Sequence, residues 1–415
     1  MDINVFADWE GMQGPLLMGV LSIVHTKGHQ VTSFDYNKDW IKRGLAQNLD
    51  PDLQFYTGHQ YLTGDKANFG VFTDSSPDRW GRTLMDRREA ILARKEKRKV
   101  RKLFEEDYLL GVYDAYRMGG LRFKVEGSEN FQHADPVLAA PPWTSLRELE
   151  HASLQLESDL LKESEAIKWI NLLIAPGASL GGARPKASIL DENQNLWIAK
   201  FPSVKDSHDT GAWEMVVNEL AQRSGINVSK GMVKQFNSEH HTFLSKRFDR
   251  TSNEDRIHFA SALTLLGLTD GSQGASYLHL AEFIMRHGAF ANADLEELWK
   301  RIVFQMAVKN TDDHLRNHGF LLTNNGWRLS PAYDINPVYY GTGLTLNVSE
   351  TDNSLNFELA REVAKYFRLS DNQAKKIIEH IKETVKGWVE VANRYNIRTK
   401  EQELMAAAFE LATSP

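Results

Sequence analysis

The sequence predicts an α+β protein with strands concentrated in its first half and helices in its second. Short β-favouring runs at 4–7 and 19–24, interrupted by glycines, indicate a small sheet at the start. Two apolar runs within 185–201, separated by a polar turn, predict a hairpin. From about residue 255 nearly every segment has the spacing of an amphipathic helix, apart from an irregular part at 310–350.

Length and composition narrow the classes of function. The chain has 415 residues, which at roughly 150 residues per domain predicts two or three packed units. Its net charge of −6 argues against a molecule that acts as a polycation over its whole surface. Cysteine is absent, which excludes disulfides, thiolate nucleophiles, cysteine-ligated zinc and iron–sulfur clusters. The chemistry must therefore use oxygen and nitrogen groups.

The N-terminal residues carry no basic segment followed by an apolar run, so no secretory leader is predicted. The longest apolar stretch, 16–24, is shorter than the about 20 residues that cross a bilayer. We expect a cytoplasmic protein without a membrane partner.

A strongly basic segment lies at 79–102, with eleven Lys and Arg residues against three acids on a predicted helix. Two interpretations stay open from the sequence: a solvated helix face, or a surface for a phosphate backbone or an acidic partner. A weakly periodic, Pro-containing and Gly-containing stretch at 126–145 predicts the main linker. A helix is predicted after it, from Ser145 to Ile174.

Residues 177–186 are small and glycine-rich, a composition that lets backbone amides approach phosphate, although the P-loop pattern is absent. The hairpin that follows ends at Lys200, whose ammonium at the end of an apolar strand needs an anionic partner. Glu214 lies near the start of the next predicted helix and could pair with Lys200. A glycine segment, a strand lysine and a helix acid in this order are typical of a protein-kinase-like small lobe.

The most informative segment begins at Asp312, which has an asparagine five residues later at Asn317 and another acid, Asp334, 17 residues beyond that. This spacing matches the catalytic and metal-binding loops of a kinase, in which the first acid accepts the hydroxyl proton and the other two residues bind Mg²⁺. A capped loop followed by a turn is the structural alternative, because Asp and Asn favour such positions.

Other enzyme classes find little support. His314 and His318 are four residues apart, but no third zinc ligand with suitable spacing follows. The sequence also lacks a Gly-x-Ser-x-Gly elbow and a dinucleotide fingerprint, which argues against a hydrolase or a dehydrogenase.

At these motifs the chain resembles the HipA family, the serine/threonine kinases that form the toxin half of bacterial toxin–antitoxin pairs. Residues 114–123 resemble the end of that family's N-terminal subdomain, and 179–186 resemble its phosphate loop. Residues 246–250 resemble its hinge, and the two acidic loops match in order and spacing. One departure is Lys246, which stands where some relatives have an acid.

The resemblance implies a role for each matching residue, with ATP and Mg²⁺ as cofactors. Asp312 is the implied catalytic base, and Ser179 is the implied autophosphorylation site, whose dianion would repel the ATP phosphates and silence the kinase. Asn317 and Asp334 are the implied metal ligands. The residues implied to bind the nucleotide are Gly181, Gly182, Ala183, Arg184, Pro185, Lys186, Lys200, Lys246, Arg247, Phe248, His314, Arg316, Asn317, Tyr333 and Asp334.

The resemblance further implies a two-lobe fold with an N-terminal subdomain at 1–135, a small lobe at 145–250 and a helical large lobe at 251–415. Its implied activity is phosphorylation of a translation component such as an aminoacyl-tRNA synthetase. Its implied partners are a helix-turn-helix antitoxin and, through the antitoxin, operator DNA. Two alternatives remain: a nonenzymatic co-repressor scaffold that binds antitoxin and operator DNA, and a small-molecule kinase.

Overall fold

The computed structural model describes residues 1–26, 29–43, 48–64, 66–132, 141–158, 163–174 and 184–414. The chain forms two compact units. Unit 1 comprises Met1–Val204 and Arg247–Thr269, and unit 2 comprises Lys205–Lys246 and Asp270–Pro415. The three segments expected from the sequence differ from these units in their limits and stay a prediction.

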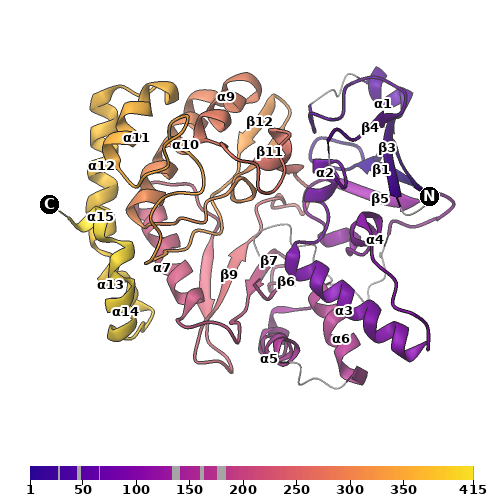
Figure 1. Cartoon of the computed structure of the whole chain (residues 1–415), viewed down its shortest axis with the longest axis horizontal. Helices are drawn as coiled ribbons and strands as arrows, with labels where there is room; N and C mark the ends of the chain where they lie inside the picture. The colour runs from indigo at the N-terminus through magenta and orange to yellow at the C-terminus, as the bar shows by residue number, and fades with distance from the viewer. Residues whose placement is uncertain are drawn as a thin grey trace. The chain divides into compact units, whose positions relative to one another are not determined.

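Unit 1 contains an antiparallel sheet in the order β4-β3-β2-β1-β5, drawn mainly in indigo in Figure 1. Its core side chains alternate along β1, where Ile3, Val5 and Ala7 are fully buried. This confirms the small sheet expected at the start of the chain. The strands are β1 (Asp2–Ala7), β2 (Leu16–Thr26), β3 (His29–Tyr36), β4 (Gln60–Tyr61) and β5 (Leu121–Val125).

In unit 1, helix α3 begins directly after Asp78. The Asp78 side chain accepts a hydrogen bond from the Gly81 amide and so caps the helix. The helix expected over 79–102 is shorter than predicted: α3 ends at Lys95, and Lys97 has a φ of 53°. The described helices of this unit are α1 (Lys38–Lys42), α2 (Gly70–Asp74), α3 (Arg79–Lys95), α4 (Glu105–Leu110), α5 (Leu146–Glu157), α6 (Glu163–Ile174) and α8 (Ala262–Leu265).

The single helix expected from Ser145 to Ile174 is wrong, because this stretch forms two helices, α5 and α6. α5 ends with Ser158 as its C-cap, whose amide donates to the carbonyls of Leu154 and Leu156. Serine disfavours helix interiors because its hydroxyl competes for backbone hydrogen bonds, and Ser158 stands where α5 ends.

The expected hairpin is confirmed as β6 (Lys186–Leu190) and β7 (Leu196–Lys200), which pair antiparallel. The Asp191 carboxylate closes the turn by accepting hydrogen bonds from the backbone amides of Asn193 and Asn195. Unit 1 also contains the short strand β10 (Phe259–Ser261).

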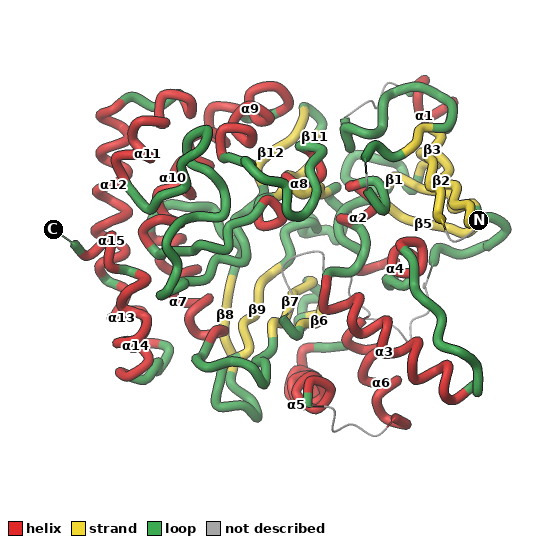
Figure 2. Tube along the Cα trace, viewed as in Figure 1, coloured by secondary structure: helices red, strands yellow, loops and turns green. Residues whose placement is uncertain are grey.

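Unit 2 is mainly helical, as expected, and Figure 2 shows its helices in red and its two short hairpins in yellow. Its central helix is α10, in which Trp299 and Phe304 are fully buried; α9, α11, α12 and α15 pack against it. The hairpins are β8 (Gly231–Lys234) with β9 (Thr242–Lys246) and β11 (Gly319–Thr323) with β12 (Gly326–Leu329). The helices are α7 (Thr210–Arg223), α9 (Tyr277–His287), α10 (Ala291–Ala307), α11 (Phe357–Val363), α12 (Asp371–Lys386), α13 (Trp388–Arg394), α14 (Thr399–Met405) and α15 (Glu410–Thr413).

Across the described parts of the chain, every helix is too short or too polar to span a bilayer.

Candidate functional site

The loop that carries the predicted catalytic acid follows the end of α10 and includes a short 3-10 turn at Leu315–Asn317. Asn317 is buried, and its Nδ2 donates a hydrogen bond of 2.9 Å to the backbone carbonyl of Asp312. Its Oδ1 is also buried and has no hydrogen-bond partner among the described residues. Because a buried amide oxygen without a partner costs free energy, this atom indicates a ligand that the protein alone does not supply.

Asp312 is exposed on the surface of unit 2. The surrounding protein desolvates its carboxylate and raises its pKa, His314 lowers the pKa, and the charge of Asp334 raises it again. The two carboxylates are therefore close enough to interact. An exposed carboxylate with a raised pKa has the properties of a general base.

The Asp334 loop is fixed to its surroundings by backbone hydrogen bonds. The Ala332 amide donates to Asn227 O at 2.8 Å, and the Ser229 amide donates to Ala332 O at 3.1 Å. Asp334 itself has a φ of 55°, a conformation unfavourable for most residues other than glycine. Such local strain persists only where the neighbouring structure imposes it.

Tyr333 connects the two acidic loops, because its hydroxyl donates a hydrogen bond of 2.6 Å to the backbone carbonyl of Arg316. The predicted residues Asp312, His314, Arg316, Asn317, Tyr333 and Asp334 therefore come together within unit 2. The Arg316 guanidinium forms a bidentate ion pair with Asp270 at 2.8 and 2.9 Å. Asp270 was not singled out from the sequence, because it lies in a remote glycine-containing loop.

The oxygen donors of these two loops fit Mg²⁺. The Asn317 amide oxygen and the Asp334 carboxylate are hard ligands, and Mg²⁺ in kinases is commonly held by one or two such groups together with substrate phosphates. No cluster of three or more His, Asp or Glu side chains suited to a metal ion occurs in the described residues. A Mg²⁺ site in which Asn317 and Asp334 supply two ligands and substrate phosphates supply others is consistent with two protein donors and no larger cluster among the described residues.

A small hollow adjoins Asp334 and is lined in part by Glu214, Ser229 and Tyr333. Glu214 lies on α7 and is 4% exposed. The Ser229 hydroxyl is buried without a hydrogen-bond partner in the described structure. The pairing of Glu214 with Lys200 stays a prediction.

The predicted phosphate-binding lysines of unit 1 lie on the β6–β7 hairpin. Lys186 and Lys200 are direct cross-strand partners, and they are 2% and 6% exposed. Lys186 Nζ forms an ion pair of 2.5 Å with the Asp78 carboxylate at the start of α3. Arg184 and Pro185 lead into this hairpin, whereas Ser179 and Gly181, Gly182 and Ala183 lie outside the described residues.

The predicted hinge residues have separate partners. Lys246 ends β9, and its amide donates to the Lys230 carbonyl at 2.9 Å. The Arg247 side chain is buried and donates to both oxygens of Asp249, at 2.8 and 2.5 Å. The Phe248 ring packs near Phe259. Any contact of Arg247 with adenine would therefore come from its backbone, because Asp249 holds its guanidinium.

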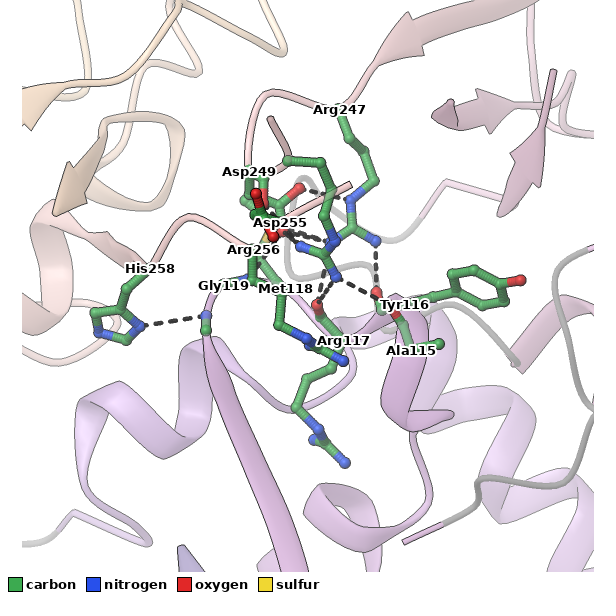
Figure 3. A network of polar contacts seen from close by, with 12 residues as sticks. Ala115, Tyr116, Arg117, Met118, Gly119, Arg247, Asp249, Asp255, Arg256 and His258 are labelled. Atoms are coloured by element: carbon green, nitrogen blue, oxygen red, sulfur yellow. Dashed lines mark hydrogen bonds and ion pairs between the residues drawn. The ribbon is translucent and has the colours of Figure 1, made fainter. Parts of the chain in front are cut away.

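Asp249 is the centre of a buried polar network in unit 1 (Figure 3). It accepts hydrogen bonds from Arg247, from Arg250 at 2.6 Å and from the Gly119 amide at 2.9 Å. The two arginines also donate to the carbonyl of Arg117, at 3.2 and 2.9 Å. Burial alone would raise the pKa of Asp249, but the two guanidinium groups more than offset it and hold the pKa well below its usual value.

Many cations of the basic segment 79–102 have partners inside unit 1. Arg82 forms a bidentate ion pair with Glu105, Arg98 pairs with Glu89, and Arg101 pairs with Asp107. These contacts favour a structural role for that part of the segment. Lys95, Lys97, Lys99 and Lys102 are exposed on the surface.

The sequence pattern missed three residues that contact predicted site residues or their loops within their own unit. Asp78 lies directly before the predicted basic helix, and Thr345 lies in a stretch without a motif. Asp313 follows the predicted base directly, and the doublet itself was the one available signal. Asp313 is fully buried, and burial raises its pKa to about 7, although hydrogen bonds from Tyr277 and Thr345 partly oppose this.

Comparison with known proteins identifies the family. A family model described as the HipA-like C-terminal domain matches residues 178–389, which is just over half of the chain. The chain belongs to the HipA-like family. The matched HipA-like range includes residues 178–186 of the glycine segment, the hairpin and both acidic loops.

Two relatives illustrate the range of similarity of this HipA-like chain. A curated protein of Haemophilus influenzae, described as a putative kinase, is 27% identical over 179 residues. That alignment covers 38% of this chain and 52% of the relative, so the chain spans about half the length of the curated relative it matches.

The second relative is HipA in the solved Shewanella oneidensis MR-1 complex of HipA, HipB and operator DNA. It is 18% identical, with a TM-score of 0.66, and the match covers 99% of this chain and 95% of that one. This likeness shows the fold, and the expected mixed fold of helices and sheets is confirmed.

Proposed function

We propose that this HipA-like protein is a Mg²⁺-dependent and ATP-dependent serine/threonine protein kinase that acts as the toxin of a toxin–antitoxin pair. The observation that carries the proposal is the pairing of an exposed acid, Asp312, with a buried, unpartnered amide oxygen on Asn317 and a second acid, Asp334. A proton acceptor beside two hard oxygen ligands is the arrangement that phosphoryl transfer requires.

In this proposal, Asp312 accepts the proton of the attacking hydroxyl while the γ-phosphoryl group moves from ATP to that oxygen. Asn317 and Asp334 hold Mg²⁺, which neutralises charge on the phosphates. Lys186 and Lys200, both buried on the hairpin, are the proposed phosphate-binding cations. The relative described as a putative kinase supports the same class of reaction.

We also propose the family's partners for this chain. The HipA of the Shewanella complex is bound to HipB and operator DNA, which supports a helix-turn-helix antitoxin as partner here. The substrate would be a translation component such as an aminoacyl-tRNA synthetase. Phosphorylation of Ser179 would silence the kinase, because a dianion beside bound ATP repels its phosphates.

The proposal is tested by incubating the protein with labelled ATP and Mg²⁺, alone and in a cell lysate, with EDTA as the control. Mass spectrometry should locate phosphate on Ser179 and on serine or threonine of a second protein. Binding of ATP without any protein phosphorylation would contradict the proposal. Labelled metabolite in place of labelled protein would indicate a small-molecule kinase, and operator binding without phosphotransfer would indicate a scaffold.

A further inference from the structure

The two consecutive aspartates of the catalytic loop lie in opposite environments. Asp312 is exposed, whereas Asp313 is fully buried. Asp313 Oδ2 accepts a hydrogen bond from the Tyr277 hydroxyl, and its Oδ1 accepts one of 2.8 Å from the Thr345 amide. With both oxygens engaged inside the protein, Asp313 is not available to a substrate hydroxyl.

Thr345 contacts the residues on both sides of Asp312. Its amide donates to the Asp313 carboxylate, and its hydroxyl donates a hydrogen bond of 2.7 Å to the backbone carbonyl of Thr311. Asn317 in turn donates to the carbonyl of Asp312 itself. Hydrogen bonds therefore fix the chain at three successive residues: Thr311, Asp312 and Asp313.

The segment that carries Thr345 is itself anchored to the start of α9. The Tyr277 amide donates to Asn347 O at 2.9 Å, and the Asn347 amide donates to Ala275 O at 2.9 Å. Tyr277 is fully buried, so its hydroxyl is a fixed donor to Asp313. These bonds form a closed set in which Thr345 and Tyr277 both bind Asp313.

We propose that Asp313 and Thr345 are positioning residues that fix the Asp312 carboxylate for proton acceptance. This inference rests on the proposed kinase function. A general base must lie within hydrogen-bond reach of the proton that it removes, and a displacement of about 1 Å can lower the rate by roughly 100-fold. Asp313 is buried, and the Thr345 hydroxyl binds the Thr311 carbonyl, so we assign both residues a positioning role.

The Thr345 hydroxyl offers the cleanest test, because the residue is exposed and its substitution leaves the core intact. Thr345→Val keeps the size and the amide of the residue but removes the hydroxyl, and Thr345→Ser keeps the hydroxyl. We expect Thr345→Val to lower kcat by roughly 10-fold to 100-fold with unchanged ATP affinity, and Thr345→Ser to retain the wild-type kcat within about threefold.

A second readout separates this inference from the proposed function. Hydrogen exchange of the amides at 311–314 should be faster in Thr345→Val than in the wild type and in Thr345→Ser, whether or not the protein is a kinase. Tyr277→Phe, which removes the other bond to Asp313, should likewise lower kcat and leave ATP affinity unchanged.

The outcomes then distinguish the two ideas. An active wild type with unchanged kcat in Thr345→Val and Tyr277→Phe would overturn the positioning role and leave the kinase function standing. A loss of kcat that Thr345→Ser shares with Thr345→Val would also overturn it. Unchanged exchange at 311–314 in Thr345→Val would overturn the positioning role whatever the activity of the wild type. An inactive wild type whose exchange responds to Thr345→Val would overturn the proposed function alone.

Discussion

Lys186 and Lys200 are paired directly across the β6–β7 hairpin, and both side chains are buried. Like charges at directly opposed positions destabilise a sheet unless anions balance them. The Asp78 carboxylate balances Lys186 at 2.5 Å. The cap of α3 is thus part of the predicted phosphate site, a link that connects residues far apart in the sequence.

Asp78→Asn should destabilise the protein strongly, because it retains a capping oxygen but removes the charge that pairs with buried Lys186. Breaking a buried ion pair costs about 3–5 kcal/mol. Urea unfolding measures the loss, and exposed Asp86 on the same helix supplies the control variant Asp86→Asn. Because the loss of the Asp78 charge leaves the hairpin more positive, ATP should raise the Tm of Asp78→Asn more than that of the wild type. Equal stability of the two variants would contradict this role of Asp78.

Asp249→Asn should lower stability in a manner that depends on pH. The pKa of Asp249 is lower in the folded protein than the value of about 4 in an unfolded chain. Its charge therefore contributes stability above about pH 4, and this contribution is lost as the pH falls through the folded pKa. Urea unfolding should give Asp249→Asn a free energy of unfolding far below that of the wild type at pH 7. At pH 3 the difference between the two proteins should be smaller. Exposed Asp255→Asn is the control, and a difference independent of pH would refute the assignment.

Comparing Arg316→Ala with Asp270→Ala distinguishes a role of Arg316 in nucleotide binding from its role in the ion pair with Asp270. Their ion pair is largely exposed and contributes at most about 1 kcal/mol, so both variants should remain folded. If Arg316 contributes to the nucleotide site, Arg316→Ala should lose phosphotransfer while Asp270→Ala retains it. Equal activities in a labelled-ATP assay would show that the pair is structural.

Asp334→Asn should weaken metal binding. Removing a charged ligand should lower the affinity for divalent metal by at least roughly tenfold, since even partners of metal ligands contribute factors of about 10 to 100. Electron paramagnetic resonance of bound Mn²⁺, in the presence of a nonhydrolysable ATP analogue, measures this without turnover. Glu383→Gln on α12, which removes one exposed ion pair, is the matched control. Undiminished Mn²⁺ binding by Asp334→Asn would remove this residue from the metal site.

Much of the fold follows from local patterns in the sequence. The β6–β7 hairpin and the first two strands were predictable because period-two apolar runs and polar turns are local signals. Lys97 shows the limit of such signals: its residue type suits a helix, yet its positive φ places it beyond the end of α3. Helix ends depend on tertiary packing, which the local pattern does not contain.

The site could be predicted only in part, for the same reason. Asp312, Asn317 and Asp334 form a fixed spacing that carries chemical meaning by itself. Thr345 has meaning only through its contacts with Thr311 and Asp313, which are brought to it by folding. Many residue types can position a catalytic group through hydrogen bonds, so such residues are identified from the structure and not from a sequence motif.

The most direct test of the central claim compares phosphotransfer by the wild type, Asp312→Ala and the control Glu383→Gln, with ATP affinity measured on all three. Because a general base acts in the transition state, Asp312→Ala should lower kcat by roughly 100-fold to 10,000-fold. Its affinity for ATP should stay within about threefold of the wild type. The assignment of Asp312 as the catalytic base would be contradicted if Asp312→Ala had the same kcat as the wild type. It would also be contradicted if the variant lost ATP affinity by as large a factor as kcat.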